Sequence, residues 1–160
     1  MKIFATTEPV SKLPWKWPPF WFLVAVLSQF AFAWWDPVAL TATPWWIYAW
    51  GYSLLGLGAL LVLGSSKCFS RHGTCIIPFQ KPSKLIQDGF YRISRNPLYL
   101  GEVLMLLALA VLMGSAWALA PAIAFGIVVT VLFIFPEEKI LQKTFGEEYK
   151  AYARKVRRWL

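Results

Sequence analysis

The feature that most constrains this chain is a run of 38 residues, 98–135, in which Glu102 is the one charged side chain. A helix that crosses the hydrocarbon core of a bilayer needs about 20 apolar residues, so this run is long enough for two crossings. Gly114-Ser115 lies near its middle and favours a tight turn there. We therefore predict two spans, at residues 98–113 and 117–135, that form a helical hairpin.

Two further apolar runs precede this one, at residues 19–35 and 45–64. The first ends at Asp36-Pro37, and the second follows Pro44, a residue type that favours the first turn of a helix. Of the 160 residues, 15% are charged, against about 25% in soluble domains. The predicted fold class is therefore all-α, a polytopic membrane protein whose single domain, residues 1–160, has about four transmembrane helices.

The end of the first run resembles a signal-peptide cleavage site at Ala31-Phe32-Ala33. A signal peptide has a short basic region before its apolar stretch, whereas the region before residue 19 is long and rich in proline. The bulky pair Trp34-Trp35 also follows the motif directly. We therefore predict that this run is retained as a membrane span.

The Lys and Arg residues all fall on one side of a four-span arrangement. Three precede the first span, six lie between the second and third spans, and seven follow the fourth, which accounts for all 16. The opposite loops, residues 36–44 and 114–116, have none. Positively charged loops stay in the cytoplasm, so we predict that both termini are cytoplasmic. The net charge of +8 then favours anionic membrane lipids as partners, and not nucleic acid.

The tail after the fourth span, residues 136–160, has the pattern of an amphipathic helix. Its apolar and aromatic residues recur every three or four positions, and basic residues take the opposite side. The apolar positions are Leu141, Phe145, Tyr149, Tyr152 and Val156. A helix of this kind lies on the membrane surface or covers a cytoplasmic cleft.

A first polar cluster, residues 89–101, leads into the third span. Its structural interpretation is that Asn96 caps the helix, Pro97 begins it, and nearby arginines anchor it to lipid headgroups. Its functional interpretation is an anion site, because the free N–H groups of a helix start lie beside Arg95. Gly101 would let a ligand or a neighbouring helix come close.

A second cluster, Glu137-Glu138, follows the fourth span. Because the third and fourth spans form a hairpin, the start of one lies beside the end of the other. We therefore expect the two glutamates to face residues 96–101 on the cytoplasmic side. A binding site and a structural salt-bridge network both remain open interpretations of this arrangement.

Glu102 lies inside the apolar run, about 9 Å beyond Asn96 along the helix axis. A carboxylate within a membrane span is a functional candidate. It can also simply reach the interface, and the sequence leaves both interpretations open.

Cys68, His72 and Cys75 follow a spacing that invites a metal ion. Gly73-Thr74 would interrupt the helix needed to align them, and structural zinc usually has four ligands. We therefore predict no metal site. Because the segment is expected in the reducing cytoplasm, we also predict no disulfide.

The order of these motifs resembles a known family, the integral-membrane methyltransferases related to isoprenylcysteine carboxyl methyltransferase and phospholipid methyltransferase. The resemblance covers about residues 65–158. It is carried by Gly89-x-Tyr91-Arg92-x-x-Arg95-Asn96-Pro97-x-Tyr99-x-Gly101, then Glu137-Glu138-x-x-Leu141, and finally Phe145-Gly146-x-x-Tyr149-x-x-Tyr152. The isoprenylcysteine enzymes have histidine where this chain has Asn96, and asparagine is typical of small bacterial relatives, which favours a prokaryotic inner membrane.

The resemblance implies methyl transfer from S-adenosylmethionine to a lipophilic acceptor, either a carboxylate oxygen or an amine nitrogen. The cofactor would lie between the start of the third span and the glutamate pair. The residues expected to bind it are Tyr91, Arg95, Asn96, Pro97, Leu98, Tyr99, Gly101, Glu137, Glu138 and Phe145. The residues expected to act in catalysis are Arg95, Asn96 and Glu102, the last as a base for an amine acceptor.

Two other functions fit the membrane topology. The first is a non-enzymatic interaction or assembly protein on the same scaffold. The second is a transporter, which is disfavoured because the spans carry few polar residues along their length. The sequence does not specify an oligomeric state.

Overall fold

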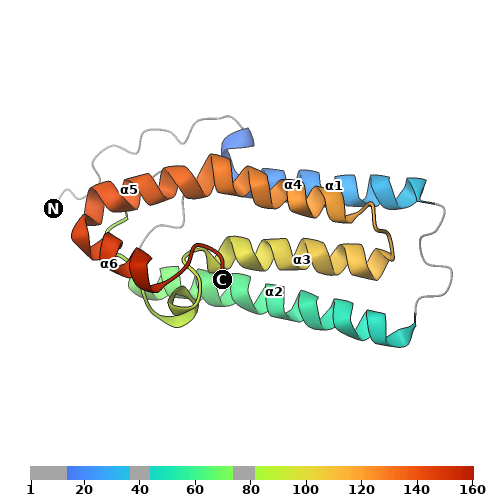
Figure 1. Ribbon diagram of the computed structural model, residues 1–160, viewed down its shortest axis with the longest axis horizontal. Coiled ribbons are helices and arrows are strands. Elements are labelled where there is room, and N and C mark those ends of the chain that lie inside the picture. The colour runs from blue at the N-terminus through green and yellow to red at the C-terminus, as the bar shows by residue number, and fades with distance from the viewer. Residues whose placement is uncertain (1–13, 37–43, 74–81) are drawn as a thin grey trace.

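The computed structural model describes residues 14–36, 44–73 and 82–160, and the regular structure within these ranges is helical. Four long helices run side by side along the molecule (Figure 1). They are α1 (Pro18–Trp35), α2 (Trp45–His72), α3 (Pro97–Met113) and α4 (Leu119–Val129). The all-α class predicted from the sequence is confirmed.

Within the described ranges, three helical stretches are long and apolar enough to cross a membrane: Pro18–Trp35, Trp45–His72 and Leu119–Phe145. The helix α3 is also apolar and has 17 residues, which is at the short end of the range for a membrane span. Large apolar side chains on their outer faces are exposed, as expected for helices that contact lipid. The protein therefore belongs to the membrane class, and the count of four spans stays a prediction.

The four helices pack in one order across the bundle. Figure 1 shows α3 between α2 and α4, with α1 against α4. The contact between α2 and α3 is close at Gly58 and Gly101, where a Cβ atom on Gly101 would lie 2.6 Å from the Gly58 carbonyl oxygen. The main core cluster includes Leu106, Phe125 and Phe133, all at most 2% exposed.

The predicted turn between the third and fourth spans is present. Gly114 ends α3 with a left-handed conformation, φ 61°, which glycine adopts without steric cost. Ser115 donates a 2.7 Å hydrogen bond to Asp36 and so ties this turn to the end of α1. Gln29 donates to the carbonyl oxygens of Leu106 and Ala118, which links α1 to both arms of the hairpin.

The helix α2 extends eight residues beyond the predicted limit at residue 64 and ends at His72. The basic segment 65–72 is polar, but it contains no helix-breaking residue before Gly73, which has φ 58°. Ser66 and Ser70 bond back to carbonyl oxygens four residues earlier. Polarity marked the end of the apolar run and not the end of the helix.

The tail is two helices where the sequence predicted one. The helix α5 (Phe135–Phe145) continues α4 through a π-helical turn, Thr130–Ile134. This turn precedes Pro136, which has no N–H to donate to the carbonyl four residues back. Gly146, with φ 53°, then separates α5 from α6 (Glu147–Lys155). The chain therefore folds back, and α6 lies beside the end of the bundle where α2 ends and α3 begins (Figure 1). We call this the basic end of the bundle.

Candidate functional site

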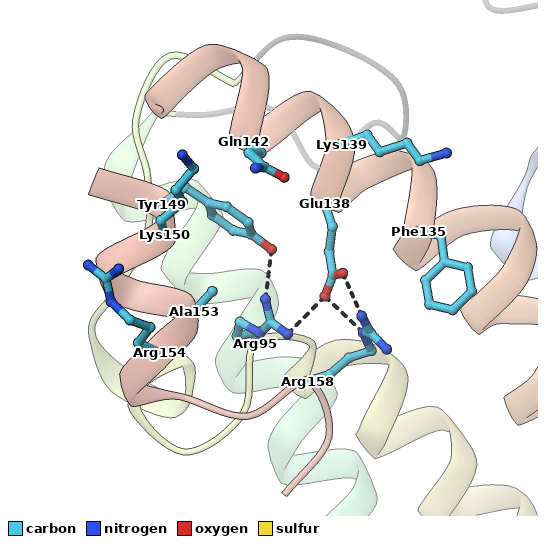
Figure 2. A pocket seen from close by; sticks show the side chains of 10 residues that line it. All are labelled: Arg95, Phe135, Glu138, Lys139, Gln142, Tyr149, Lys150, Ala153, Arg154 and Arg158. Atoms are coloured by element: carbon cyan, nitrogen blue, oxygen red, sulfur yellow. Dashed lines mark hydrogen bonds and ion pairs between the residues drawn. The ribbon is translucent and has the colours of Figure 1, made fainter. Parts of the chain in front are cut away.

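A cavity of about 490 Å³ opens at the basic end of the bundle. Its walls come from the start of α3, from α5 and α6, and from the segment after α6, residues 156–160 (Figure 2). The lining residues are Arg95, Phe135, Glu138, Lys139, Gln142, Tyr149, Lys150, Ala153, Arg154 and Arg158. Five of these ten side chains are cationic and one is a carboxylate.

Glu138 lies where two arginines converge (Figure 2). Its Oε1 atom is 3.2 Å from Arg95 Nη2 and accepts a 2.9 Å hydrogen bond from Arg158 Nε. Its Oε2 atom accepts a 2.8 Å bond from Arg158 Nη2, which makes the Arg158 contact bidentate. Charge-assisted, two-pronged pairing of this kind fixes the plane of a carboxylate, and the hydrogen bond to Glu138 raises the pKa of Arg158.

Arg95 joins α3 to both tail helices. Besides its ion pair with Glu138, it donates a 3.0 Å hydrogen bond from Nη1 to the hydroxyl oxygen of Tyr149. Its guanidinium carbon lies 5.9 Å from the centre of the Tyr149 ring. Burial raises the pKa of the Tyr149 phenol, so the hydroxyl stays protonated. The Nε atom of Arg95 is buried and has no partner among the described residues.

The segment after α6 returns to the start of α3. The backbone N–H of Arg95 donates a 2.9 Å bond to the carbonyl oxygen of Arg157. The carbonyl oxygen of Arg158 accepts from Asn96 Nδ2 at 3.0 Å and from Ser94 Oγ at 3.2 Å. Asn96 does precede α3 as predicted, but its side chain holds this segment and makes no capping bond to the helix.

A second polar pair lies deeper in the bundle. The Tyr99 hydroxyl donates a 3.0 Å bond to Glu137 Oε1. Glu102 lies within electrostatic reach of the same hydroxyl, and its Oε2 atom is buried without a partner among the described residues. The hairpin therefore brings the glutamate pair to the start of α3, as the sequence predicted, but the two glutamates take different partners.

Several predicted ligand residues do not line the cavity. Pro97 is buried at the start of α3, and Leu98 packs against the main core. Gly101 faces α2, so its close neighbour is a helix and not a cavity.

The aromatic residues predicted to bind the cofactor, Tyr91, Tyr99 and Phe145, are also placed elsewhere. Tyr91 packs against Phe69, and Tyr99 lies against Phe133. Phe145 packs on the cluster of Tyr149 and its neighbours in α6. The rings that do line the cavity are Phe135 and Tyr149.

Sequence reasoning did not select Arg158, although it contacts Glu138, Asn96 and the ring of Phe135, 4.8 Å from its guanidinium carbon. Seven Lys and Arg residues follow residue 136, and no local pattern distinguishes this one from the rest. Its role depends on the turn at Gly146 and on the extended backbone at Val156, φ −119° and ψ 130°.

Cys68 is buried against Asp88, with 4.0 Å between Sγ and a carboxylate oxygen, and His72 lies 3.6 Å from the same carboxylate. Thr74 and Cys75 lie outside the described residues. The expectation of no metal at this segment stays a prediction.

Fold and cavity together define a polytopic membrane protein with a charged site at one boundary of its helical bundle. Residues 46–148 match the profile of the phospholipid methyltransferase family. The chain belongs to this family.

Two relatives extend the comparison. Over 117 residues the chain is 32% identical to protein-S-isoprenylcysteine O-methyltransferase B of Arabidopsis thaliana, a match that covers 70% of this chain and 58% of that protein. Over 63 residues it is 41% identical to an uncharacterized protein of Haemophilus influenzae, covering 39% of this chain and all of that protein. No solved structure matches the chain significantly.

Proposed function

We propose that the protein is an S-adenosylmethionine-dependent methyltransferase that acts on a lipophilic acceptor at the cytoplasmic face of a membrane. Family membership and the named plant relative support the reaction class. The apolar helices support an acceptor that approaches through the bilayer. The basic end of the bundle supports the cytoplasmic side, by the distribution of Lys and Arg.

The residues around the cavity fit the cofactor. A volume of about 490 Å³ lies within the range of roughly 300–1,000 Å³ that is typical of small-molecule sites. The unpartnered Nε of Arg95 is a buried donor suited to a carboxylate. Glu138 supplies the opposite charge for an ammonium group, and the Phe135 and Tyr149 rings offer faces for adenine or a sulfonium.

When bound, S-adenosylmethionine would supply a methyl group carried on a positively charged sulfur. An acceptor oxygen or nitrogen bonds to the methyl carbon while the carbon–sulfur bond breaks on the opposite side, and S-adenosylhomocysteine leaves. The task of the protein is then chiefly to position the two reactants, which supplies much of the rate in such reactions. Arg95 and Glu138 would orient the charged groups of the cofactor, and α6 forms one wall of the cavity beside them. Asn96 holds the segment 156–160 in place through the carbonyl oxygen of Arg158, whose side chain contacts Glu138.

The nature of the acceptor decides the role of Glu102. A carboxylate acceptor has no proton to lose, so it needs no base. An ammonium acceptor must lose one before it can attack, and the unpartnered Oε2 of Glu102 is a candidate to receive it. Glu102 does not line the cavity, so an acceptor that used it would approach from within the bundle.

The observation that carries the proposal is the convergence of Arg95 and Glu138 on one cavity, from segments 43 positions apart in the sequence. The test is calorimetry of the detergent-purified protein with S-adenosylhomocysteine. We expect measurable binding by the natural protein and binding weakened by about tenfold or more in Glu138→Gln and Asn96→Ala. Glu148→Gln, at an exposed glutamate in the same tail whose partner Gln87 is outside the cavity lining, is the matched control and should bind normally.

Absence of binding by well-folded natural protein would contradict the proposal and favour a non-enzymatic interaction role. If binding is seen, labelled cofactor and total membrane lipid will show which acceptor carries the methyl group.

A further inference from the structure

The segment after α6, residues 156–160, contacts both Ser94–Asn96 before α3 and Glu138 in α5. Its backbone accepts three hydrogen bonds from Ser94, Arg95 and Asn96. The side chain of Trp159, next along the chain, packs against the main core. Residues 156–160 are therefore held by hydrogen bonds to Ser94–Asn96 and by the packing of Trp159 on the main core. These contacts fix the backbone position of Arg158.

From that fixed point the Arg158 guanidinium reaches two walls of the cavity. One side makes the bidentate contact with Glu138, at 2.9 and 2.8 Å. Its carbon lies 4.8 Å from the centre of the Phe135 ring, which is within cation–π range. Figure 2 shows Arg158 between Glu138 and Phe135 and opposite Tyr149.

The orientation of Glu138 depends on this contact. Arg95 reaches Glu138 through one 3.2 Å contact, and its other terminal nitrogen is committed to Tyr149. Among the residues that the structure describes, Arg158 alone binds both oxygen atoms of Glu138, with its Nε on Oε1 and its Nη2 on Oε2. This planar, two-point contact sets the plane of the carboxylate. Lysine is a point charge and cannot reproduce this pairing.

We propose that Arg158 is a positioning residue for the cofactor site, acting by holding Glu138 in the orientation that the cofactor meets. This inference rests on the proposed function. It assigns a role to a residue outside the membrane helices and to the segment 156–160 as part of the site. The opposite possibility is that Arg158 occupies the place of a cofactor cation, in which case its removal would strengthen binding.

The test compares four variants by calorimetry with S-adenosylhomocysteine and by thermal unfolding in detergent. We expect Arg158→Ala and Arg158→Lys to weaken binding by about tenfold, because neither forms the fork. Arg157→Ala is the matched control: its side chain is exposed, while the backbone oxygen that Arg95 uses is retained. It should bind as the natural protein does. Arg158→Gln serves if the alanine variant does not fold.

A double-mutant comparison separates positioning from a general structural effect. If Arg158 acts through Glu138, adding Arg158→Ala to Glu138→Gln should cost little further affinity. An equal loss in both backgrounds would overturn the inference. So would normal or tighter binding by the single variants. Failure of the natural protein to bind would instead count against the proposed function, so the two outcomes are distinguishable.

Discussion

The hydroxyl of Tyr99 donates a 3.0 Å hydrogen bond to Glu137, and this bond joins the first turn of α3 to the first turn of α5. Tyr99 is 7% exposed. The two residues are 38 positions apart, and the turn at Gly114 brings them together. The bond therefore closes the hairpin at the end where the cavity lies.

Tyr99→Phe should destabilise the protein, because it leaves the carboxylate of Glu137 without the hydroxyl donor. Glu137 is half-buried, and loss of the partner of such an acceptor costs about 1–2 kcal/mol. In a protein of this size that lowers the midpoint of thermal unfolding by roughly 2–8 °C. Tyr52→Phe, at a tyrosine that is 64% exposed, is the control. Equal midpoints for the two variants would show that the bond contributes nothing.

Gly101→Ala should destabilise the contact between α2 and α3. The added Cβ would lie 2.6 Å from the Gly58 carbonyl oxygen, and a backbone atom cannot rotate away as a side chain can. Overpacking of this kind costs about 1–3 kcal/mol. Gly56→Ala is the matched control, since no atom lies within 4 Å of a Cβ there, and it should be neutral or slightly stabilising. A stable Gly101→Ala variant with lost cofactor binding would show instead that this glycine faces a ligand.

The sequence predicted the features that depend on apolar length and on turn chemistry. The 38-residue run and Gly114 predict the hairpin, and the hairpin brings Arg95 to Glu138. The spacing did not say which partner each glutamate takes. Consecutive residues of a helix point about 100° apart, so Glu137 meets Tyr99 and Glu138 meets the arginines, and which of the two directions faces the cavity depends on the packing of α5.

The features that were missed depend on tertiary contacts. No local sequence pattern distinguishes Arg158 from the other basic residues of the tail. Its contacts exist because α6 folds back at Gly146 and because Asn96 binds its carbonyl oxygen. Likewise, Phe145 and Tyr149 fit the same apolar stripe, yet only Tyr149 lines the cavity. Periodicity assigns side chains to a helix face but does not say what that face packs against.

Asn96→Ala should loosen the segment after α6 at one identifiable point. It removes one of two donors to the Arg158 carbonyl oxygen, at a cost of about 1 kcal/mol. We expect the amide proton of Arg95, which bonds to the neighbouring Arg157 carbonyl, to exchange with solvent about fivefold faster. Ser66→Ala, whose hydroxyl bonds within α2, should leave that exchange rate unchanged. An unaltered rate in the Asn96 variant would contradict the anchoring role.

Stability should fall at alkaline pH because of buried tyrosines in the segment before α3 and in α6. Burial raises the pKa of Tyr91, Tyr149 and Tyr152 above the ordinary value, which is about 10. The unfolded chain then loses these protons first, so stability is complete below about pH 10 and declines as the pH rises towards the folded-state pKa values.

The contribution of one tyrosine can be measured by comparing how steeply the unfolding midpoint falls with pH in two variants. Tyr152→Phe removes one titrating group and should flatten the decline of the unfolding midpoint between about pH 10 and 12. Leu85→Ala perturbs the same cluster without removing a titrating group, so it should lower the midpoint equally at every pH. Parallel curves for both variants would contradict the assignment to Tyr152.

The membrane orientation can be tested with single cysteines in a background that lacks Cys68 and Cys75. Trp117, 65% exposed, lies near the hairpin turn, and the exposed Lys143 lies in α5 at the opposite end. Because the Lys and Arg residues gather at the α5 end, Trp117→Cys should react with an impermeant maleimide in intact cells. Lys143→Cys should react only after the membrane is permeabilised. The reverse pattern would put the cavity of Arg95 and Glu138 on the outer face, away from the cytoplasmic pool of S-adenosylmethionine, and would exclude the proposed function whatever the cavity binds in detergent.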